Sequence, residues 1–498
     1  METTQLLFQP GRRPGSWSSG YQGRPVQLCM QRFCNLCDLK EREQLRSFSG
    51  GKLEVKLTAH RRPAFWEWEE RPFYRAHIVK VLPPEFPTGK VVDEGFEIDG
   101  SRLNLVVYRT PQGVILVDPG YVGFEQGYDP YVGRLMADHK IIASVVTHGH
   151  LDHWNALGQT TGPVFMPRTA YRLASMHASW TSESQPPQLD SALRNARDNL
   201  IFPGKPVLLD ELPVNIDTFH LPHSIPETMG LVIRGERGRA VHLGDFKFNG
   251  FGAKAKAETI ARLQQIAKEP VDFLALTIYN AHVPGFVPIE DLVVDALTDI
   301  MVKAEGRVVI TCFSTNLDRV LRLAKIARIL GRQVSFTGAG MQNCREMIGF
   351  EETGYSGKEV AFVTGCQAEE RSFLWNIAQG TAAMDRSDTL VFSSRCIPGN
   401  EERLREHYTR LRPKVGRLIV TRGEVSQLGL QGLGTEEVFT HVSGHEYGDG
   451  IRLALEILRP KKVIAWPQTS PQIEAFRKIC EEVGGIEILS EDERVIDI

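Results

Sequence analysis

The sequence predicts an α/β protein built from two main parts, and three observations support this fold class. The chain has 498 residues, which is too long for one ordinary hydrophobic core, so two large units are expected. From about residue 92 to residue 280, short apolar runs closed by turns indicate the strands of a partly buried sheet. From about residue 284 to residue 418, helical and strand patterns alternate, which is typical of a parallel sheet covered by helices.

The first part begins with a series of candidate strands. The run LNLVVYRT (103–110) alternates apolar and polar side chains, whereas VILVD (114–118) is continuously apolar. A third run, IIASVV (141–146), ends directly before a segment rich in histidine, and VDFLALT (271–277) indicates another buried strand. We therefore expect a sheet with polar, potentially functional side chains at the ends of its strands.

The second part alternates helices and strands. Helical periodicity in EDLVVDALTDIMVKA (290–304) and LDRVLRLAKIARILG (317–331) alternates with the strand runs RVVITCFS (307–314) and QVSFTGAG (333–340). This order predicts a doubly wound domain, after which short strands and one helix return.

Composition limits the classes of function. With 42% hydrophobic and 24% charged residues, the chain is typical of a soluble globular protein. A formal net charge of −3 excludes a wholly basic nucleic-acid coat but leaves a local basic groove open. No signal peptide or 18-residue apolar stretch is present, so we expect a cytoplasmic protein with no membrane partner. Homo-oligomers are compatible with the sequence, but no motif requires them.

The first 90 residues are expected to form an N-terminal extension. Cys29, Cys34 and Cys37 are spaced C-x4-C-x2-C and would hold a metal if His60 or His77 completed the set, but reduced, unligated thiols are preferred. Trp66 and Trp68 suit base stacking, although packing of an edge strand explains them at least as well. The remaining cysteines are expected in the hydrophobic core, at Cys312, Cys344, Cys366, Cys396 and Cys480.

The segment THGHLDHWNA (147–156) carries the strongest chemical signal. His148 and His150 are two residues apart on an extended loop, so both side chains can face one ion. Asp152 and His153 follow across a turn and are expected to face a second ion. Imidazole nitrogen and carboxylate oxygen suit zinc, or manganese where oxygen ligands predominate. Two such ions can activate water and bind a phosphoryl or acyl oxygen.

Together with later motifs, this segment resembles the metallo-β-lactamase superfamily. VILVDPG resembles the strand whose aspartate, here Asp118, braces the metal loop. LPHSIPET supplies His223 as a third histidine, and VHLGDFKFNG supplies Asp245 as the aspartate that bridges two ions. His220 and His242 fall outside the matched positions and are expected to have supporting roles. The resemblance implies an αββα sandwich.

A closer resemblance is to ribonuclease J and its β-CASP nuclease relatives. LPHSIPE and HLGDFKFN are followed in the same order by YNAHVPGF, TCFSTNLDRV, SRCIPGNE and HVSGHE, over about residues 95 to 470. The resemblance implies that the doubly wound part is a β-CASP domain inserted into the sandwich. The expected division is an N-terminal extension (1–90), the first part of the metallo-β-lactamase domain (91–283), the β-CASP domain (284–418) and the second part of the sandwich (419–498).

The resemblance assigns roles to individual residues. The first ion would be held by His148, His150, His223 and Asp245, and the second by Asp152, His153 and Asp245. Asp152 and His445 are the expected catalytic residues, with His445 as proton donor to the leaving oxygen. A phosphate-binding turn is expected at His441, Val442, Ser443, Gly444 and His445. Ser314 and Asn316 are expected to contact the phosphate backbone, with ordinary turn chemistry as the alternative.

Two positions depart from the family pattern. Thr277 stands where an acidic residue is expected near the metals, and Pro467 stands where a histidine would complete the second ion site. Gln468 or Thr469 would supply an oxygen that favours a harder ion, or His282 would replace the missing ligand. The departure is also compatible with one tight ion and one labile ion, or with a protein that has lost catalysis, but retained hydrolysis is preferred because the six other expected ligands are present.

These observations predict a metal-dependent phosphodiester hydrolase that acts on single-stranded RNA in RNA processing or decay. Two divalent ions are expected, zinc at the first site and zinc, manganese or magnesium at the second. Exonucleolytic and endonucleolytic action are both allowed. The competing hypotheses are a DNA-directed β-CASP nuclease, another phosphodiesterase, and a catalytically weakened RNA-binding or regulatory protein.

Overall fold

The structure is a computed structural model that forms two compact units, Met1–Phe73 and Tyr74–Ile498. It describes residues 43–49, 52–57, 104–120, 138–180, 187–207, 214–352, 358–397, 399–466, 470–489 and 495–498. In the first unit, β1 (Glu43–Ser49) and β2 (Lys52–Leu57) pair as an antiparallel hairpin. The expectations for the N-terminal cysteines and tryptophans, Cys29, Cys34, Cys37, Trp66 and Trp68, lie outside the described residues and stay predictions.

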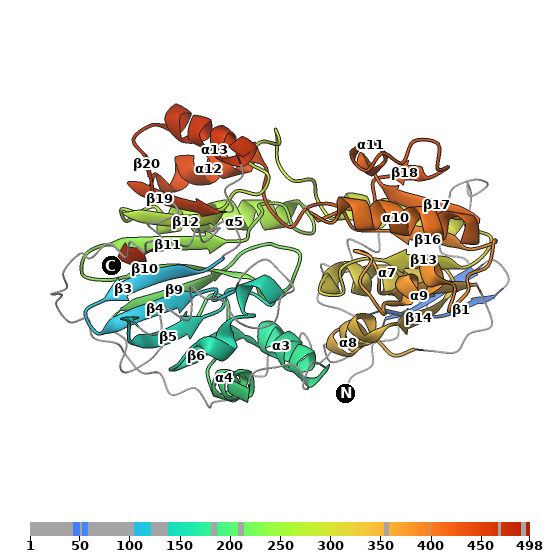
Figure 1. Ribbon diagram of the computed structural model, residues 1–498, viewed down its shortest axis with the longest axis horizontal. Coiled ribbons are helices and arrows are strands. Elements are labelled where there is room, and N and C mark those ends of the chain that lie inside the picture. Colours follow the sequence, from blue (N-terminus) through green and yellow to red (C-terminus); the bar gives the residue numbers. More distant parts are fainter. Residues whose placement is uncertain are drawn as a thin grey trace, which may run out of the picture. The chain divides into compact units, whose positions relative to one another are not determined.

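The larger unit contains two sheets packed face to face, with helices on their outer sides (Figure 1). One sheet has the order β21-β3-β4-β5-β6-β7 and the other has the order β20-β19-β12-β11-β10-β9-β8. The strands of the first are β3 (Val106–Thr110), β4 (Gly113–Val117), β5 (Ile141–Val145), β6 (Val164–Pro167), β7 (Leu200–Ile201) and β21 (Val495–Asp497). The strands of the second are β8 (Pro206–Val207), β9 (Asn215–His220), β10 (Met229–Arg234), β11 (Arg239–Gly244), β12 (Phe273–Thr277), β19 (Lys462–Trp466) and β20 (Glu487–Ile488).

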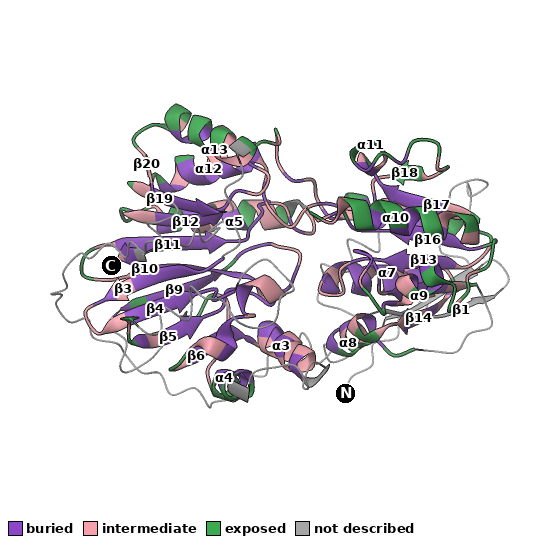
Figure 2. Cartoon of the chain, in the orientation of Figure 1, coloured by how far each residue is buried: buried purple, intermediate pink, exposed green. Residues whose placement is uncertain are grey.

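The seven-stranded sheet is buried on both faces, which explains its continuous apolar runs. Successive side chains of a strand point to opposite faces. In β10, Leu231 and Ile233 therefore lie in the core between the sheets, whereas Val232 lies in the core on the outer side. Figure 2 shows the central strands β10 and β11 as almost entirely buried. This double burial is why the sequence shows little alternation here.

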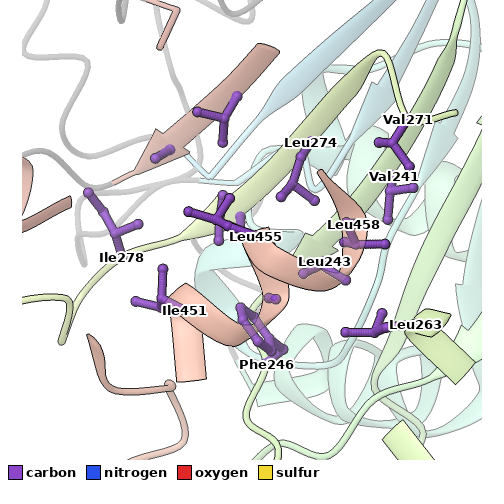
Figure 3. Close-up of a cluster of buried hydrophobic side chains, with 14 of the residues drawn as sticks. Val241, Leu243, Phe246, Leu263, Val271, Leu274, Ile278, Ile451, Leu455 and Leu458 are labelled. Carbon is purple, nitrogen blue, oxygen red and sulfur yellow. The ribbon is translucent and has the colours of Figure 1, made fainter. Parts of the chain in front are cut away.

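Helices complete both sides of the sandwich. The outer core of the seven-stranded sheet lies beneath α5 (Ala253–Ile266), α12 (Gly448–Leu458) and α13 (Ser470–Val483). Figure 3 shows Leu455 and Leu458 of α12 over Leu243 and Leu274 of the strands. On the other side, α3 (Arg168–Trp180) and α4 (Pro187–Asp198) pack on β6, flanked by the short turns η2 (Leu151–His153) and η3 (Leu157–Gln159). The αββα arrangement confirms the predicted fold class.

A third sheet forms the inserted domain. Its order is β14-β15-β13-β16-β17-β18, and all its paired strands are parallel. Its strands are β13 (Val308–Thr311), β14 (Gln333–Thr337), β15 (Glu359–Val363), β16 (Thr389–Phe392), β17 (Arg417–Thr421) and β18 (Glu436–Val438). Its helices are α6 (Asp291–Lys303), α7 (Leu317–Ile329), α8 (Ala339–Met347), α9 (Phe373–Gln379), α10 (Glu401–Leu411), η4 (Arg412–Lys414) and α11 (Glu424–Gln427). The predicted parallel, helix-covered sheet is confirmed.

The inserted sheet extends past the expected boundary at residue 418. β17 crosses this position and pairs with β16, and β18 adds the last strand. The expected boundary is therefore wrong, because a short apolar run such as RLIV does not reveal which sheet it joins. The five predicted core cysteines are all buried and free. No helix among the described residues is long and apolar enough to cross a membrane.

Candidate metal centre

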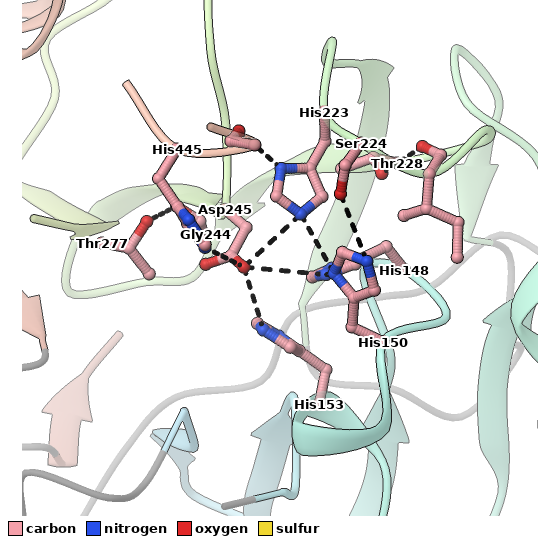
Figure 4. Close-up of polar contacts among 12 residues, drawn as sticks. His148, His150, His153, His223, Ser224, Thr228, Gly244, Asp245, Thr277 and His445 are labelled. Carbon is pink, nitrogen blue, oxygen red and sulfur yellow. Dashed lines mark hydrogen bonds and ion pairs between the residues drawn. The ribbon is translucent and has the colours of Figure 1, made fainter. Parts of the chain in front are cut away.

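Three histidines and one aspartate converge from three separate segments (Figure 4). His148 and His150 lie on the loop after β5, His223 follows β9, and Asp245 comes directly after β11. β9 and β11 both pair antiparallel with β10, so they run in the same direction and end at the same edge of the sheet. The structure thus brings together the four residues expected around the first ion. We call this group the four-donor site.

The donor atoms of this site lie close enough to share one ion. His150 Nδ1 is 3.0 Å from His148 Nε2 and 3.1 Å from His223 Nε2. Asp245 Oδ2 is 3.7 Å from His148 Nε2 and 3.6 Å from His223 Nε2. A tetrahedral zinc ion with bonds of about 2.1 Å needs donors about 3.4 Å apart. Asp245 Oδ1 is buried without a hydrogen-bond partner, as expected of an oxygen that a cation would satisfy.

A neighbouring oxygen holds the second ring nitrogen of each histidine. The pairs are His148 Nδ1 with Thr147 Oγ1 (3.0 Å), His150 Nε2 with Ser224 Oγ (3.2 Å) and His223 Nδ1 with the Gly444 carbonyl (2.7 Å). Such contacts fix the tautomer and orientation of a metal-binding imidazole. Glycine is required at 444, because an added Cβ would lie 2.7 Å from His223 Cε1.

Burial keeps these histidines in the neutral form that binds metal. It lowers the pKa of His148 and His223 well below the usual value, and neighbouring imidazoles lower it further. Burial also lowers the pKa of His150 to about 4. Burial would raise the pKa of Asp245, but two neighbouring imidazoles outweigh this effect and hold it well below the usual range. Three neutral imidazoles and one carboxylate form a donor set suited to a divalent ion.

Asp118 holds the histidine loop from its position after β4. One carboxylate oxygen accepts from Thr147 N (2.7 Å), and the other accepts from Thr147 Oγ1 (2.7 Å) and His153 Nδ1 (2.9 Å). Its φ of 53° lies in the left-handed region, which aspartate tolerates better than most residues. Asp118, Thr147 and His148 therefore form one hydrogen-bonded chain that ends at the four-donor site.

Asp152 and His153 lie beside the four-donor site. His153 Nε2 is 3.3 Å from Asp245 Oδ2 and 3.8 Å from Asp152 Oδ2. Burial would lower the pKa of His153, but Asp245 and Asp118 outweigh this effect and raise it well above the usual value. The described residues contain two groups of mutually close donor atoms, and Asp152 belongs to neither.

Of the remaining candidate positions for a second ion, the structure describes His282 and Thr277. Pro467, Gln468 and Thr469 lie outside the described residues. His282 is exposed to solvent. Thr277 is buried, and its hydroxyl donates to the Gly244 carbonyl over 3.0 Å.

His445 lies at the edge of the four-donor site. Its Nε2 is 2.9 Å from Asp245 Oδ2, and the ring of Tyr279 packs on the imidazole with centroids 4.5 Å apart. Asn280, the next residue, donates from Nδ2 to Ser443 Oγ (2.9 Å) and to the His445 carbonyl (3.0 Å). The segment after β12 thus fixes both the backbone and the ring of His445.

A buried ion cluster supports the HVSGH segment from below. Glu290 accepts from Lys247 Nζ (3.1 Å) and Arg319 Nη2 (2.9 Å), and all three side chains are at most 2% exposed. Lys247 Nζ also donates to the Ser443 carbonyl (3.2 Å), and Arg319 Nη1 lies 3.3 Å from His441 Nδ1. Burial would raise the pKa of Glu290, but Arg319 and Lys247 outweigh this effect and lower it to about 2. The cluster therefore links the sandwich to the inserted domain.

The residues predicted to contact substrate differ in exposure. Val442 and Asn316 are only 2% and 3% exposed, whereas His441, Ser443 and Ser314 are partly exposed. Burial and, to a smaller extent, the neighbouring Arg319 lower the pKa of His441 to about 3. The phosphate-contact roles of this set stay predictions.

Five residues of the site were not predicted from the sequence, namely Asn104, Thr147, Ser224, Tyr279 and Asn280. Thr147 and Ser224 directly adjoin predicted ligands, so their position in the motifs is a usable signal. Asn104 has no such signal, because it lies 48 residues before the aspartate that it contacts.

Comparison with known proteins agrees with the fold. The family model of the metallo-beta-lactamase superfamily matches residues 98–296. Ribonuclease J of Sinorhizobium meliloti is 30% identical over 398 residues, covering 73% of this chain and 66% of that protein. Ribonuclease J of Thermus thermophilus is 28% identical over 391 residues, covering 73% of this chain and 65% of that protein. Ribonuclease J of Mycobacterium tuberculosis is 26% identical over 413 residues, covering 76% and 69%.

A solved structure extends the likeness of the fold. A protein of unknown function from Enterococcus faecalis V583 aligns with a TM-score of 0.54 at 13% identity, over 79% of this chain and 97% of that chain. At this identity the likeness concerns the fold alone. Among the sequence relatives, the chain spans just under two thirds of the S. meliloti and T. thermophilus proteins, at 66% and 65% of their lengths.

Proposed function

This chain is a ribonuclease J-like member of the metallo-β-lactamase superfamily, and on that premise we propose that it is a metal-dependent hydrolase of phosphodiester bonds in single-stranded RNA. The observation that carries the proposal is the position of His445, whose Nε2 lies 2.9 Å from Asp245 of the four-donor site. The side chain proposed as proton donor thus adjoins the proposed metal ligands, an arrangement suited to hydrolysis of a phosphodiester.

The proposed metal is zinc, because three imidazole nitrogens and one carboxylate oxygen form a donor set typical of zinc. When bound at His148, His150, His223 and Asp245, the ion would activate water and stabilise negative charge on the phosphoryl oxygens. The side chains supply the proton transfers. His445 is placed to donate a proton to the leaving oxygen, and Asp152 to orient the attacking water.

The proposed phosphate-binding surface is the HVSGH segment. Its Ser443 and Gly444 are partly exposed, and beneath it the buried cations Lys247 and Arg319 pair with Glu290. The exposed turn is the part of this segment that a phosphate can reach. The same surface suits a 5′-monophosphate end or an internal phosphate, so both exonucleolytic and endonucleolytic cleavage belong to the proposal. The proposal also includes a cytoplasmic location and a role in RNA processing or decay.

The test compares cleavage of matched single strands of RNA and DNA that carry 5′-monophosphates, with zinc, manganese or magnesium. We expect metal-dependent cleavage of RNA that is lost in the His150→Ala and Asp152→Ala variants. Preferential cleavage of DNA would instead assign the chain to the DNA-directed relatives. RNA binding without cleavage, with metal bound, would identify a regulatory protein, the function suggested by Thr277 and Pro467.

A further inference from the structure

A second ion between Asp152 and His153 needs space beside both side chains, and Asn104 lies against both in this structure. The amide nitrogen of Asn104 lies 2.9 Å from Asp152 Oδ2, 3.0 Å from the Asp152 carbonyl and 3.2 Å from His153 Nε2. Asn104 is 1% exposed, so its contacts are shielded from competing water. A buried amide therefore lies against both side chains expected to bind the second ion.

The contact with His153 is the more restrictive of the two. His153 Nδ1 pairs with Asp118 Oδ2 over 2.9 Å, which leaves Nε2 as the nitrogen available to an ion. Nε2 also lies 3.3 Å from Asp245 Oδ2. The Asn104 nitrogen and the Asp245 oxygen therefore already flank the atom that a second ion would have to reach.

The amide of Asn104 is fixed as a donor. Its nitrogen contacts the Asp152 carbonyl oxygen as well as the Asp152 carboxylate. Rotation of the amide by 180° would place its oxygen against that carbonyl, and two acceptors would then face each other. Asn104 is consequently a poor replacement ligand but an effective hydrogen-bond donor at this place.

Among the described residues, few side chains near Asp152 and His153 can replace the missing ligand. His445 Nε2 lies 2.9 Å from Asp245 Oδ2, the oxygen that a bridging aspartate would share with a second ion. Thr277 donates its hydroxyl to the Gly244 carbonyl. Proline at 467 offers neither a side-chain donor atom nor an N–H, where the resemblance expects a histidine. In the four-donor site, by contrast, all four expected ligands are present and close together.

We infer that this chain binds one divalent ion tightly, in the four-donor site, and that the amide of Asn104 takes the place of a second ion between Asp152 and His153. The inference deepens the proposed function and rests on it only for the identity of the metal site. The inferred single tightly bound ion differs from the two-ion arrangement that the resemblance implies. In this inference, Asn104 limits the number of ions that one chain binds tightly.

The experiment counts ions on the full chain. Metal-free protein is titrated with zinc against a chromophoric chelator, and metal per chain is measured after buffer exchange. The variant Asn104→Asp replaces the N–H donors with a carboxylate, and Asn104→Ala removes the donors without adding charge. Asn376→Asp on the exposed surface of α9 is the charge-matched control. Circular dichroism and first-ion affinity establish that each variant is folded.

We expect one ion per chain in the wild type and in Asn376→Asp. Asn104→Asp should bind a second ion about tenfold or more tightly than the wild type, and Asn104→Ala should change in the same direction by less. Two ions of similar affinity in the wild type would overturn the inference, as would folded Asn104 variants with unchanged second-ion affinity. Failure to cleave RNA would overturn the proposed function alone, because metal number is measured without substrate.

Discussion

His445 Nε2 lies 2.9 Å from Asp245 Oδ2, although 200 residues separate them in the chain. The same aspartate oxygen is 3.7 Å from His148 Nε2 and 3.6 Å from His223 Nε2. One carboxylate therefore connects the predicted proton donor to the metal ligands. This geometry separates two proposed functions that can be measured independently, namely metal binding by the four-donor site and proton transfer by His445.

The His445→Ala variant should lose cleavage while keeping its metal. General acid catalysis contributes about 10²–10⁴-fold to a rate, so the single-turnover rate on RNA should fall by that order. Zinc content should stay at the wild-type value, because the four donors remain. His139→Ala, before β5, is the control and should cleave within about twofold of the wild type. A His445→Ala rate close to that of the wild type would contradict the assigned role.

Thr147 should control metal affinity through hydrogen bonds alone. Its hydroxyl joins Asp118 Oδ2 (2.7 Å) to His148 Nδ1 (3.0 Å). Thr147→Val keeps the shape but removes both hydrogen bonds, and loss of such a contact typically weakens metal binding by about 10–100-fold. Thr147→Ser retains the hydroxyl and should bind zinc nearly as the wild type does. Equal affinities in the two variants would show that the hydroxyl does not orient His148.

The buried ion cluster should make the protein sensitive to acid. Because the pKa of Glu290 is lowered to about 2, its contribution to stability is fully present above its unfolded pKa of about 4.3 and is lost as the pH falls toward 2. Glu290→Gln leaves two buried cations without their carboxylate, which costs about 3–5 kcal/mol. The melting temperature of Glu290→Gln should therefore be lower at pH 7 and fall less between pH 5 and pH 2.

The exposed Glu402→Gln substitution on α10 is the control for this effect. It removes one carboxylate without disturbing a buried pair, so its melting curve should follow the wild type at every pH. If Glu290→Gln and Glu402→Gln show the same acid slope, the cluster does not contribute as inferred.

The sequence predicted what depends on local pattern and missed what depends on contacts between distant segments. Continuous apolar runs and helix–strand alternation predicted both sheet systems, because periodicity and burial are coupled. The ligand motifs predicted the group of His148, His150, His223 and Asp245. Asn104 has no motif of its own. Nor did the pattern reveal that β17 and β18 join the inserted sheet, because pairing partners are set by tertiary packing.

Tyr279 should act on turnover through the ring of His445. Its ring packs 4.5 Å from that imidazole, between centroids. Tyr279→Ala removes the packing surface and should lower kcat about tenfold with little change in KM, because an imperfectly positioned acid weakens the transition state more than the bound substrate. Tyr279→Phe keeps the ring and should restore the wild-type kcat. Equal loss in both variants would assign the effect to the hydroxyl instead.

Pro467→His should act on the second ion site in combination with Asn104. The substitution supplies the histidine that the ribonuclease J resemblance expects, but the amide nitrogen of Asn104 would still lie 3.2 Å from His153 Nε2. We therefore expect Pro467→His alone to raise second-ion affinity by less than the Asn104→Asp, Pro467→His double variant does.

Pro467→Ala is the matched control, since it removes the proline without adding a nitrogen ligand. If Pro467→Ala raised the affinity as much as Pro467→His, relief of the proline constraint rather than a new ligand would explain the change. Zinc titration with a competing chelator measures all four proteins on one scale. The inference predicts that second-ion affinity rises from wild type through Pro467→His to the double variant. Such a series would show that the second site lacks a histidine ligand at 467 and that Asn104 hinders binding of the ion.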